Sequence, residues 1–229
     1  MISTQKVSRP MVQTPSLPLS HGNTATLHKR TLWRSATRLF LQDFCAAPFV
    51  ASLQPDAGLR AFARTPEREH HLLKTIAERP DSMLTLAYTD QNTIIGQVTL
   101  APADGFWDGL ANTYEIAIEV SPAWRRCGIA QQLLGLVFEQ DWLEDMIIIG
   151  MGLSWHWDMA GLRLTGFAYR AMIERLFAHY SFAEYLTSEG NILMDPANIF
   201  LARIGRRVDT ENLSSFYDRL LQSDNLPGM

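Results

Sequence analysis

Cysteine and long apolar runs are both scarce in this chain of 229 residues. Its two cysteines, Cys45 and Cys127, are too few for a disulfide framework, which favours a reducing compartment such as the cytoplasm. No uninterrupted apolar segment reaches the roughly 20 residues that a membrane-spanning helix needs, and residues 1–20 lack the apolar centre of a signal peptide. We therefore expect a cytoplasmic protein that is neither inserted into a membrane nor exported.

An excess of positive charge is also missing, because 20 basic and 24 acidic residues leave a net charge of −4. Bulk electrostatics therefore favour no nucleic-acid partner. No cysteine or carboxylate stands at metal-ligand spacing around the pair His70–His71, so we expect no bound metal. Two well-known phosphate loops, Gly-x-x-x-x-Gly-Lys-Ser/Thr and Gly-x-Gly-x-x-Gly after a strand, are absent as well.

The hydrophobic fraction of 47% and the charged fraction of 19% are typical of a globular protein. Residues 1–25 are rich in Ser, Thr, Pro and Gln and show no sustained period, which predicts a mobile N-terminal tail. Residues 26–229 then form a single domain that ends in a helix, with no internal repeat.

The most informative stretch is residues 114–140. Ile116, Ile118 and Val120 alternate with polar or small residues, which is the period-two pattern of a strand in a sheet. Ser121-Pro122 ends this strand, and apolar residues at i, i+4 and i+8 spacing from Ile129 predict an amphipathic helix. The segment therefore reads as strand, turn, basic loop and helix in one run.

Between the turn and the helix lies the pattern Arg125-x-x-Gly128-x-Ala130. The first turn of a helix has backbone N–H groups without intrahelical partners and the positive end of the helix dipole, so it attracts anions. A glycine and a small residue let the backbone close around a phosphate, and Arg125 or Arg126 adds charge. The loop is suited to a pyrophosphate.

This loop resembles the acetyl-coenzyme-A loop of the Gcn5-related N-acetyltransferases (GNAT), whose pattern is Arg/Gln-x-x-Gly-x-Gly/Ala. The resemblance implies an α/β fold of the α+β type, with a mixed, mostly antiparallel twisted sheet flanked by helices. It also implies a splay between the two central strands, in which the acyl-pantetheine arm of acetyl-CoA lies. The residues expected to contact acetyl-CoA are Ile118, Val120, Arg125, Arg126, Cys127, Gly128, Ile129, Ala130 and Gln131.

The remaining elements follow from pattern and turn residues. We expect strands at 26–30, 83–88, 94–100, 146–153, 183–186 and 199–204, and helices at 35–44, 66–77, 166–180 and 210–222. Thr65 is the expected N-cap of the helix at 66–77. Residues 102–110 are expected to form a loop whose aromatic side chains either plug the core or contact substrate.

The second half of the chain is similar to a narrower family, the acetoin-utilisation acetyltransferases. The segments that carry this similarity are Ser154-Trp-His-Trp-Asp158, Tyr169-Arg170, Asp195-Pro-Ala-Asn198 and Arg203-Ile-Gly205. The similarity implies transfer of an acetyl group from acetyl-CoA to a lysine of acetyl-CoA synthetase, which inactivates that enzyme.

Acetyl transfer to lysine needs a base, because the unperturbed pKa of the amine is about 10.4. Our candidates are Glu119 first, Glu115 second, and His156 with Asp158 as its orienting partner third. Each has a structural alternative: Glu119 as an anchor for loop backbone, Glu115 as a solvated strand residue, and His156 as a satisfied histidine. Tyr169 is the candidate proton donor to the thiolate, or else it packs its ring in a helix interface.

Two family positions hold residues that cannot do the expected chemistry. The catalytic glutamate of many lysine acetyltransferases corresponds to Tyr114, and the tyrosine that protonates the thiolate falls near Phe177. A sensor that binds acetyl-CoA without turnover therefore stays open beside the protein-lysine acetyltransferase. An acetyltransferase for a small-molecule amine also stays open, because the loop serves either acceptor.

Overall fold

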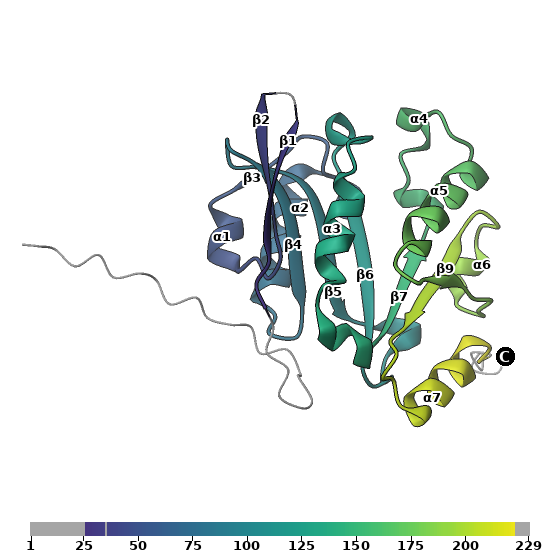
Figure 1. Ribbon diagram of the computed structural model, residues 1–229. Helices are drawn as coiled ribbons and strands as arrows, with labels where there is room; N and C mark the ends of the chain where they lie inside the picture. The colour runs from purple at the N-terminus through teal and green to yellow at the C-terminus, as the bar shows by residue number, and fades with distance from the viewer. Residues whose placement is uncertain (1–25, 35, 223–229) are drawn as a thin grey trace, which may run out of the picture.

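A computed structural model describes residues 26–34 and 36–222, so the predicted tail at 1–25 lies outside the described residues. The chain forms a twisted, mostly antiparallel sheet in the order β1-β2-β4-β5-β6-β7-β9-β8, with β3 added to β5 (Figure 1). The strands are β1 Lys29–Arg34, β2 Thr37–Gln42, β3 Gln54–Pro55, β4 Met83–Thr89, β5 Thr93–Pro102, β6 Thr113–Val120, β7 Ile147–Gly152, β8 Ala183–Glu184 and β9 Ile199–Ile204.

Helices cover both faces of the sheet. They are α1 Ala47–Ala51, α2 Pro66–Glu78, α3 Ile129–Val137, α4 Met159–Leu162, α5 Gly166–Ala178, α6 Gly190–Leu193 and α7 Thr210–Leu220. The helices α3 and α5 lie on the face turned to the viewer in Figure 1 and share one apolar core. On the other face, α1 and α2 cover a second cluster and α7 covers a third.

Most helices and strands form for the local reasons that the sequence indicates, namely caps and apolar patterns. The Thr65 hydroxyl accepts a hydrogen bond from the Arg68 amide and so caps α2. In α3, Ile129, Leu133 and Val137 are buried, as the apolar stripe requires. The hairpin β4–β5 and the strand β6 are confirmed, and the predicted mostly antiparallel sheet is observed.

The segment predicted as a helix at 35–44 is instead the strand β2, so this prediction is wrong. Leu39 and Leu41 are buried at 2% and 0% exposure, which is the period-two pattern of a strand. The strand pairs with β1 on one side and with β4 on the other. These long-range hydrogen bonds override the helical spacing of three apolar residues in a short segment.

The two central strands part after a short parallel ladder. The strand β6 pairs with β7 only from Thr113 opposite Ile147 to Glu115 opposite Ile149. Beyond this point β6 stays with β5, whereas β7 stays with β9. The predicted splay is therefore present, and it leaves one backbone edge of residues 116–120 without a strand partner in the described chain.

The aromatic loop at 102–110 plugs the core. Trp107 is 1% exposed and stacks on Phe200 with ring centroids 4.5 Å apart.

We expect Trp107→Ala to lower the free energy of unfolding by about 3–5 kcal/mol, because it leaves a large cavity. Urea denaturation measures this, with the 64% exposed Trp33 changed to alanine as the control. If both variants lost the same free energy of unfolding, Trp107 would not be filling the core.

Candidate functional site

The turn after β6 is held rigidly. Ser121 is fully buried, and its amide donates to the Ile95 carbonyl at 2.9 Å. Its hydroxyl donates to Asp56 Oδ1 at 2.5 Å, and Gly58 lies so close that a Cβ there would meet Ser121 Oγ at 2.4 Å. The start of the basic loop is therefore fixed by β5 and by the segment that follows β3.

Gly128 is the N-cap of α3 and provides no side-chain cap. Its φ of +75° is in the left-handed region that favours glycine, and a Cβ at this position would have nothing within 4 Å. The helical ladder begins with the bond from Gln132 N to Gly128 O at 3.0 Å, so the amides of residues 129–131 precede it. A capless helix start beside open space can receive an anion.

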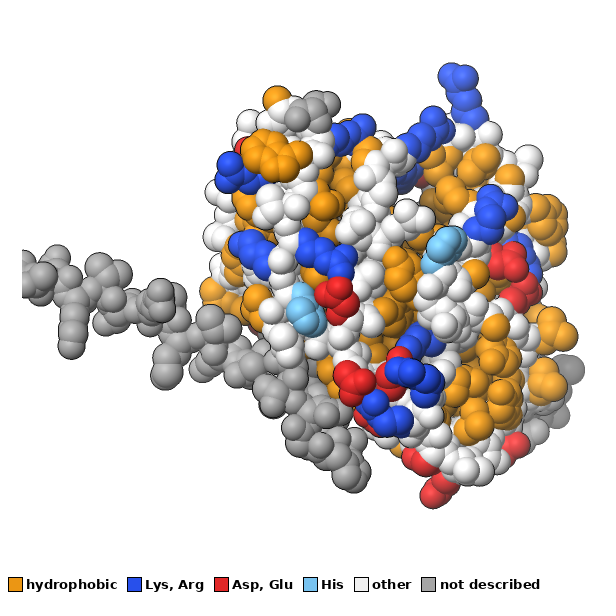
Figure 2. Space-filling view, viewed as in Figure 1, with side chains coloured by type: hydrophobic (Ala, Val, Ile, Leu, Met, Phe, Trp, Pro, Cys, Tyr) orange, Lys and Arg blue, Asp and Glu red, His pale blue; other side chains and the backbone are white. Residues whose placement is uncertain are grey.

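The two arginines of the loop are placed differently. Arg125 donates through Nε to the Val120 carbonyl at 3.0 Å and through a terminal nitrogen to Asp158 Oδ2 at 2.6 Å. It thus ties the end of β6 to the start of α4 across the splay, and its hydrogen bond lowers the pKa of Asp158. Arg126 is exposed, and basic side chains gather at the end of the molecule where α3 begins (Figure 2).

Four other predicted acetyl-CoA residues lie at or next to this helix start. The Cys127 thiol contacts the Arg125 carbonyl at 2.8 Å, and the side chain of Ile129 is buried in the core. Ala130 is half-buried, and Gln131 is exposed with its carbonyl bonded to the Tyr180 hydroxyl at 2.5 Å. Ile129 therefore offers only its backbone to a ligand.

The Glu119 side chain lies on the face of β6 that is turned away from α3, and it is 6% exposed. Its Oε1 accepts the amides of Arg60 and Ala61, both at 2.9 Å, and its Oε2 accepts from Gln97 Nε2 at 3.2 Å. Burial raises the pKa of Glu119, and the hydrogen bond from the Arg60 amide opposes this shift. The contacts are those of a loop anchor, and its role as a base stays a prediction.

Glu115 is half-buried and lies opposite Ile149 at the last rung before the strands part. Burial, followed by the nearby carboxylates of Asp104 and Glu189, raises its pKa to about 7. A carboxyl with this pKa changes its protonation state around neutral pH, so Glu115 also has the property of a proton acceptor.

We expect Glu115→Gln to raise the free energy of unfolding at pH 8 by an amount on the order of 1 kcal/mol. The folded state holds its proton up to about pH 7 and the unfolded state releases it near 4.5, so stability falls as pH rises between these values. Glutamine cannot ionise and removes this loss, so the gain vanishes at pH 4. Urea denaturation at both pH values checks this, and the exposed Glu174→Gln is the control. The same pH dependence in both variants would refute the shift.

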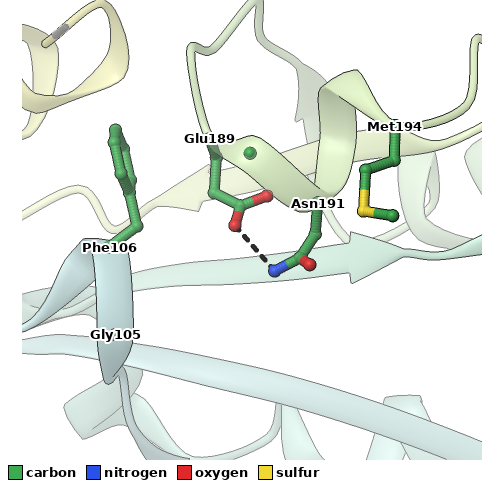
Figure 3. Close-up of a pocket in the computed structure, with 6 residues that line it drawn as sticks. Gly105, Phe106, Glu189, Asn191 and Met194 are labelled. Atoms are coloured by element: carbon green, nitrogen blue, oxygen red, sulfur yellow. Dashed lines mark hydrogen bonds between the residues drawn. The ribbon is translucent and has the colours of Figure 1, made fainter. Parts of the chain in front are cut away.

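A pocket of about 600 Å³ lies near Glu115, between the turn Gly105–Trp107 and α6. Figure 3 shows Phe106, Glu189 and Met194 around it. The Glu189 carboxylate accepts from Asn191 Nδ2 at 2.9 Å and caps α6. The side chains of this region pack with α7, so the pocket lies on the face opposite α3.

His156 follows β7 directly, in the turn Ser154–His156. Its Nδ1 lies 2.8 Å from the Ala61 carbonyl, and its ring centroid lies 5.6 Å from that of Phe62. A carbonyl oxygen can only accept a hydrogen bond, so Nδ1 carries the hydrogen and Nε2 of the neutral ring keeps its lone pair. Such a nitrogen can take a proton from an amine.

Asp158 is not the orienting partner of His156, which corrects that part of the prediction. Its carboxylate accepts from the Gly161 amide at 2.9 Å as the N-cap of α4 and from Arg125 on its other oxygen. The Ala61 carbonyl orients the imidazole of His156 instead.

Tyr169 stacks on Trp157, with ring centroids 4.9 Å apart and planes inclined by 5°. Burial raises its pKa, and the Arg125 charge opposes this shift. The ring packing is the structural alternative, and Arg125 and Asp158 are near enough to act on the hydroxyl of Tyr169.

The segments 154–158 and 195–198 are brought together although about 40 residues separate them. The Ser154 amide donates to Asn198 Oδ1 at 2.7 Å, and the Ser154 hydroxyl donates to Asp195 Oδ2 at 2.5 Å. Arg170 then donates to the Asn198 carbonyl at 2.5 Å. The loop at 195–198 therefore supports the position of the turn that contains His156.

Two polar residues of this site are missing from the sequence-based prediction, namely Glu69 and Gln97. Glu69 is fully buried on α2, in line with Leu73 on the apolar face, and Gln97 is 1% exposed in the apolar run of β5. A charged residue on the apolar face of a helix was the available signal. Burying such a group without partners is costly, so it indicates a specific partner.

No group of three or more His, Cys, Asp or Glu side chains in residues 26–34 and 36–222 is placed to hold a metal ion. His70, which belongs to the histidine pair on α2, lies with Nε2 2.8 Å from the Val50 carbonyl. Within the same ranges, every helix is too short or too polar to traverse a lipid bilayer.

Comparison with known proteins defines the class. The sequence pattern of the acetyltransferase (GNAT) family matches residues 48–149, which include the splayed strand, the loop and α3. Together with the fold and the capless helix start, this match identifies an N-acetyltransferase, and the enzymes of this family use acetyl-CoA as cosubstrate.

Within this class the chain is similar to the acetoin utilization protein AcuA. The protein of Bacillus subtilis (strain 168) is 30% identical over 200 residues, which cover 85% of this chain and 94% of that protein. The protein of Bacillus licheniformis has the same identity and coverage. The crystal structure of an acetoin utilization protein from Exiguobacterium sibiricum 255-15 superposes with a TM-score of 0.81 at 29% identity, covering 86% and 94% of the two chains. The chain belongs to the GNAT family of acetyltransferases.

Proposed function

We propose that this enzyme transfers the acetyl group of acetyl-CoA to a lysine side chain of a protein, with acetyl-CoA synthetase as the acceptor. The observation that carries the proposal is the contact of the segments 154–158 and 195–198 beside the splay. These are the most distinctive segments of the resemblance to acetoin-utilisation acetyltransferases, and they present His156 where the strands have parted.

In the proposed reaction the lysine nitrogen bonds to the thioester carbon, the carbon–sulfur bond breaks, and the thiolate takes up a proton. We propose His156 as the base, with Glu115 and Glu119 as the alternatives to test. Backbone amides of the edge from Ile118 to Val120 polarise the thioester carbonyl, and Tyr169 is the proposed proton donor to the thiolate.

The coenzyme is proposed to bind with its pyrophosphate at the start of α3. The amides of residues 128–131 and the exposed guanidinium of Arg126 supply the hydrogen bonds and the charge. Arg125 is already bonded to Val120 and Asp158, so we assign it to holding the site rather than the phosphate.

The acceptor is tested by incubating the protein with acetyl-CoA and acetyl-CoA synthetase and mapping modified lysines by mass spectrometry. Modification of one lysine, absent with Gly128→Glu, supports the proposal. Release of CoA only when a small amine is added supports an acetyltransferase for small molecules. Tight binding of acetyl-CoA without turnover on any acceptor supports a sensor and contradicts the proposal.

A further inference from the structure

Two buried carboxylates hold four consecutive backbone amides of the loop that precedes α2. Glu119 on β6 accepts the amides of residues 60 and 61, as described above. Glu69 on α2 accepts the amides of Phe62 at 3.3 Å and Ala63 at 2.9 Å through Oε2. Hydrogen bonds from backbone N–H groups to a charged oxygen are among the stronger ones in proteins, so this loop is fixed from two sides.

Gln97 joins the two carboxylates. Its Nε2 donates to Glu69 Oε1 at 2.7 Å and to Glu119 Oε2 at 3.2 Å. Gln97 also lies opposite Glu119 in the β5–β6 ladder, so the backbone sets the bridge in place. All three side chains are at most 6% exposed, and a neutral amide between them satisfies both acids without introducing a charge.

The peptide unit between Ala61 and Phe62 connects this anchored loop to His156. The unit is planar and trans, so its N–H and its C=O point in opposite directions. Its N–H is bonded to Glu69, and its C=O is the acceptor of His156 Nδ1. The orientation of one peptide plane therefore connects the buried glutamate to the imidazole.

We infer that Glu69 is a positioning residue of the acetyl-transfer site, acting through the Ala61–Phe62 peptide to set the orientation and tautomer of His156. Gln97 and Glu119 complete the support, because they fix the same loop from β5 and β6. The inference rests on the proposed role of His156 as the base. It assigns to Glu69 no contact with either substrate, since the residue is fully buried.

The test combines spectroscopy with kinetics. Two-bond ¹H–¹⁵N correlation spectra of the full-length protein report the tautomer of each neutral histidine, and the His156→Gln variant assigns the signal. In the wild type we expect hydrogen on Nδ1 and none on Nε2. In Glu69→Gln an NH2 group replaces the oxygen that accepts from Gln97, and the charge that strengthens the contacts to the loop amides is lost. We therefore expect loss of this single tautomer and a decrease of about tenfold in kcat, with KM for acetyl-CoA unchanged.

Glu67→Gln, an exposed residue on the same helix, is the matched control and should change neither the spectrum nor kcat. A wild-type spectrum with hydrogen on Nε2 would overturn the inference without any variant, even if Glu69→Gln does not fold. A Glu69→Gln enzyme with normal kcat and a normal tautomer would also overturn it. His156→Gln could instead retain activity while Glu69→Gln still changes the tautomer of His156. In that case the proposed base is wrong, and Glu69 orients His156 without contributing to acetyl transfer.

Discussion

Replacing Gly128 by glutamate is expected to weaken acetyl-CoA binding by at least about 100-fold, equivalent to ~2.7 kcal/mol. The new carboxylate would face the pyrophosphate at the start of α3, where the amides of the first helical turn would otherwise bind it. The chain should stay folded, because a Cβ at Gly128 meets nothing within 4 Å. The left-handed φ adds a strain of only about 1–2 kcal/mol.

Isothermal titration calorimetry with acetyl-CoA measures the effect, and thermal unfolding verifies the fold. Gly128→Asn is the matched control, because asparagine tolerates the left-handed region and carries no charge. It should bind acetyl-CoA within about tenfold of the wild type, since the amides that face the phosphate are kept. Unchanged binding by the glutamate variant would show that the pyrophosphate lies elsewhere.

His156→Ala is expected to lower kcat by about 100-fold, the lower range for loss of a general base. KM for acetyl-CoA should change little, because the imidazole lies beyond β7 and not at the start of α3. Steady-state CoA release measures both constants. The exposed His71→Ala is the control and should behave as the wild type.

A His156→Ala enzyme with wild-type kcat would remove His156 from the reaction. The remaining candidates would then be ranked by Glu119→Gln and Glu115→Gln. The Glu119 variant is expected to lose stability as well as activity, because an NH2 group would replace Oε2 and meet the donor Gln97 Nε2, although one oxygen still holds the two backbone amides. The Glu115 variant should instead gain stability at pH 8, so the two effects are separable.

Local sequence alone determined the loop and its flanks. The alternation from Ile116 to Val120, the Ser121-Pro122 turn and the apolar spacing from Ile129 each depend on neighbours within a few residues. Hydrogen-bond geometry and side-chain period act over this range, so strand, turn and helix start were predictable. Residues 37–42 were not, because their strand depends on pairing with β4 about 45 residues later.

The roles of the charged residues were decided by tertiary structure. Arg125 bonds to Asp158 across the splay, Glu119 bonds to the loop at 60–63, and His156 takes its orientation from Ala61, 95 residues away. No periodicity links such positions, since they meet only when two parts of the sheet and α2 come together. The sequence by itself thus determined the strand, the turn and the helix start at Gly128. The fold decided which groups remain open for chemistry, because burial and distant hydrogen-bond partners set the orientation and the pKa of each.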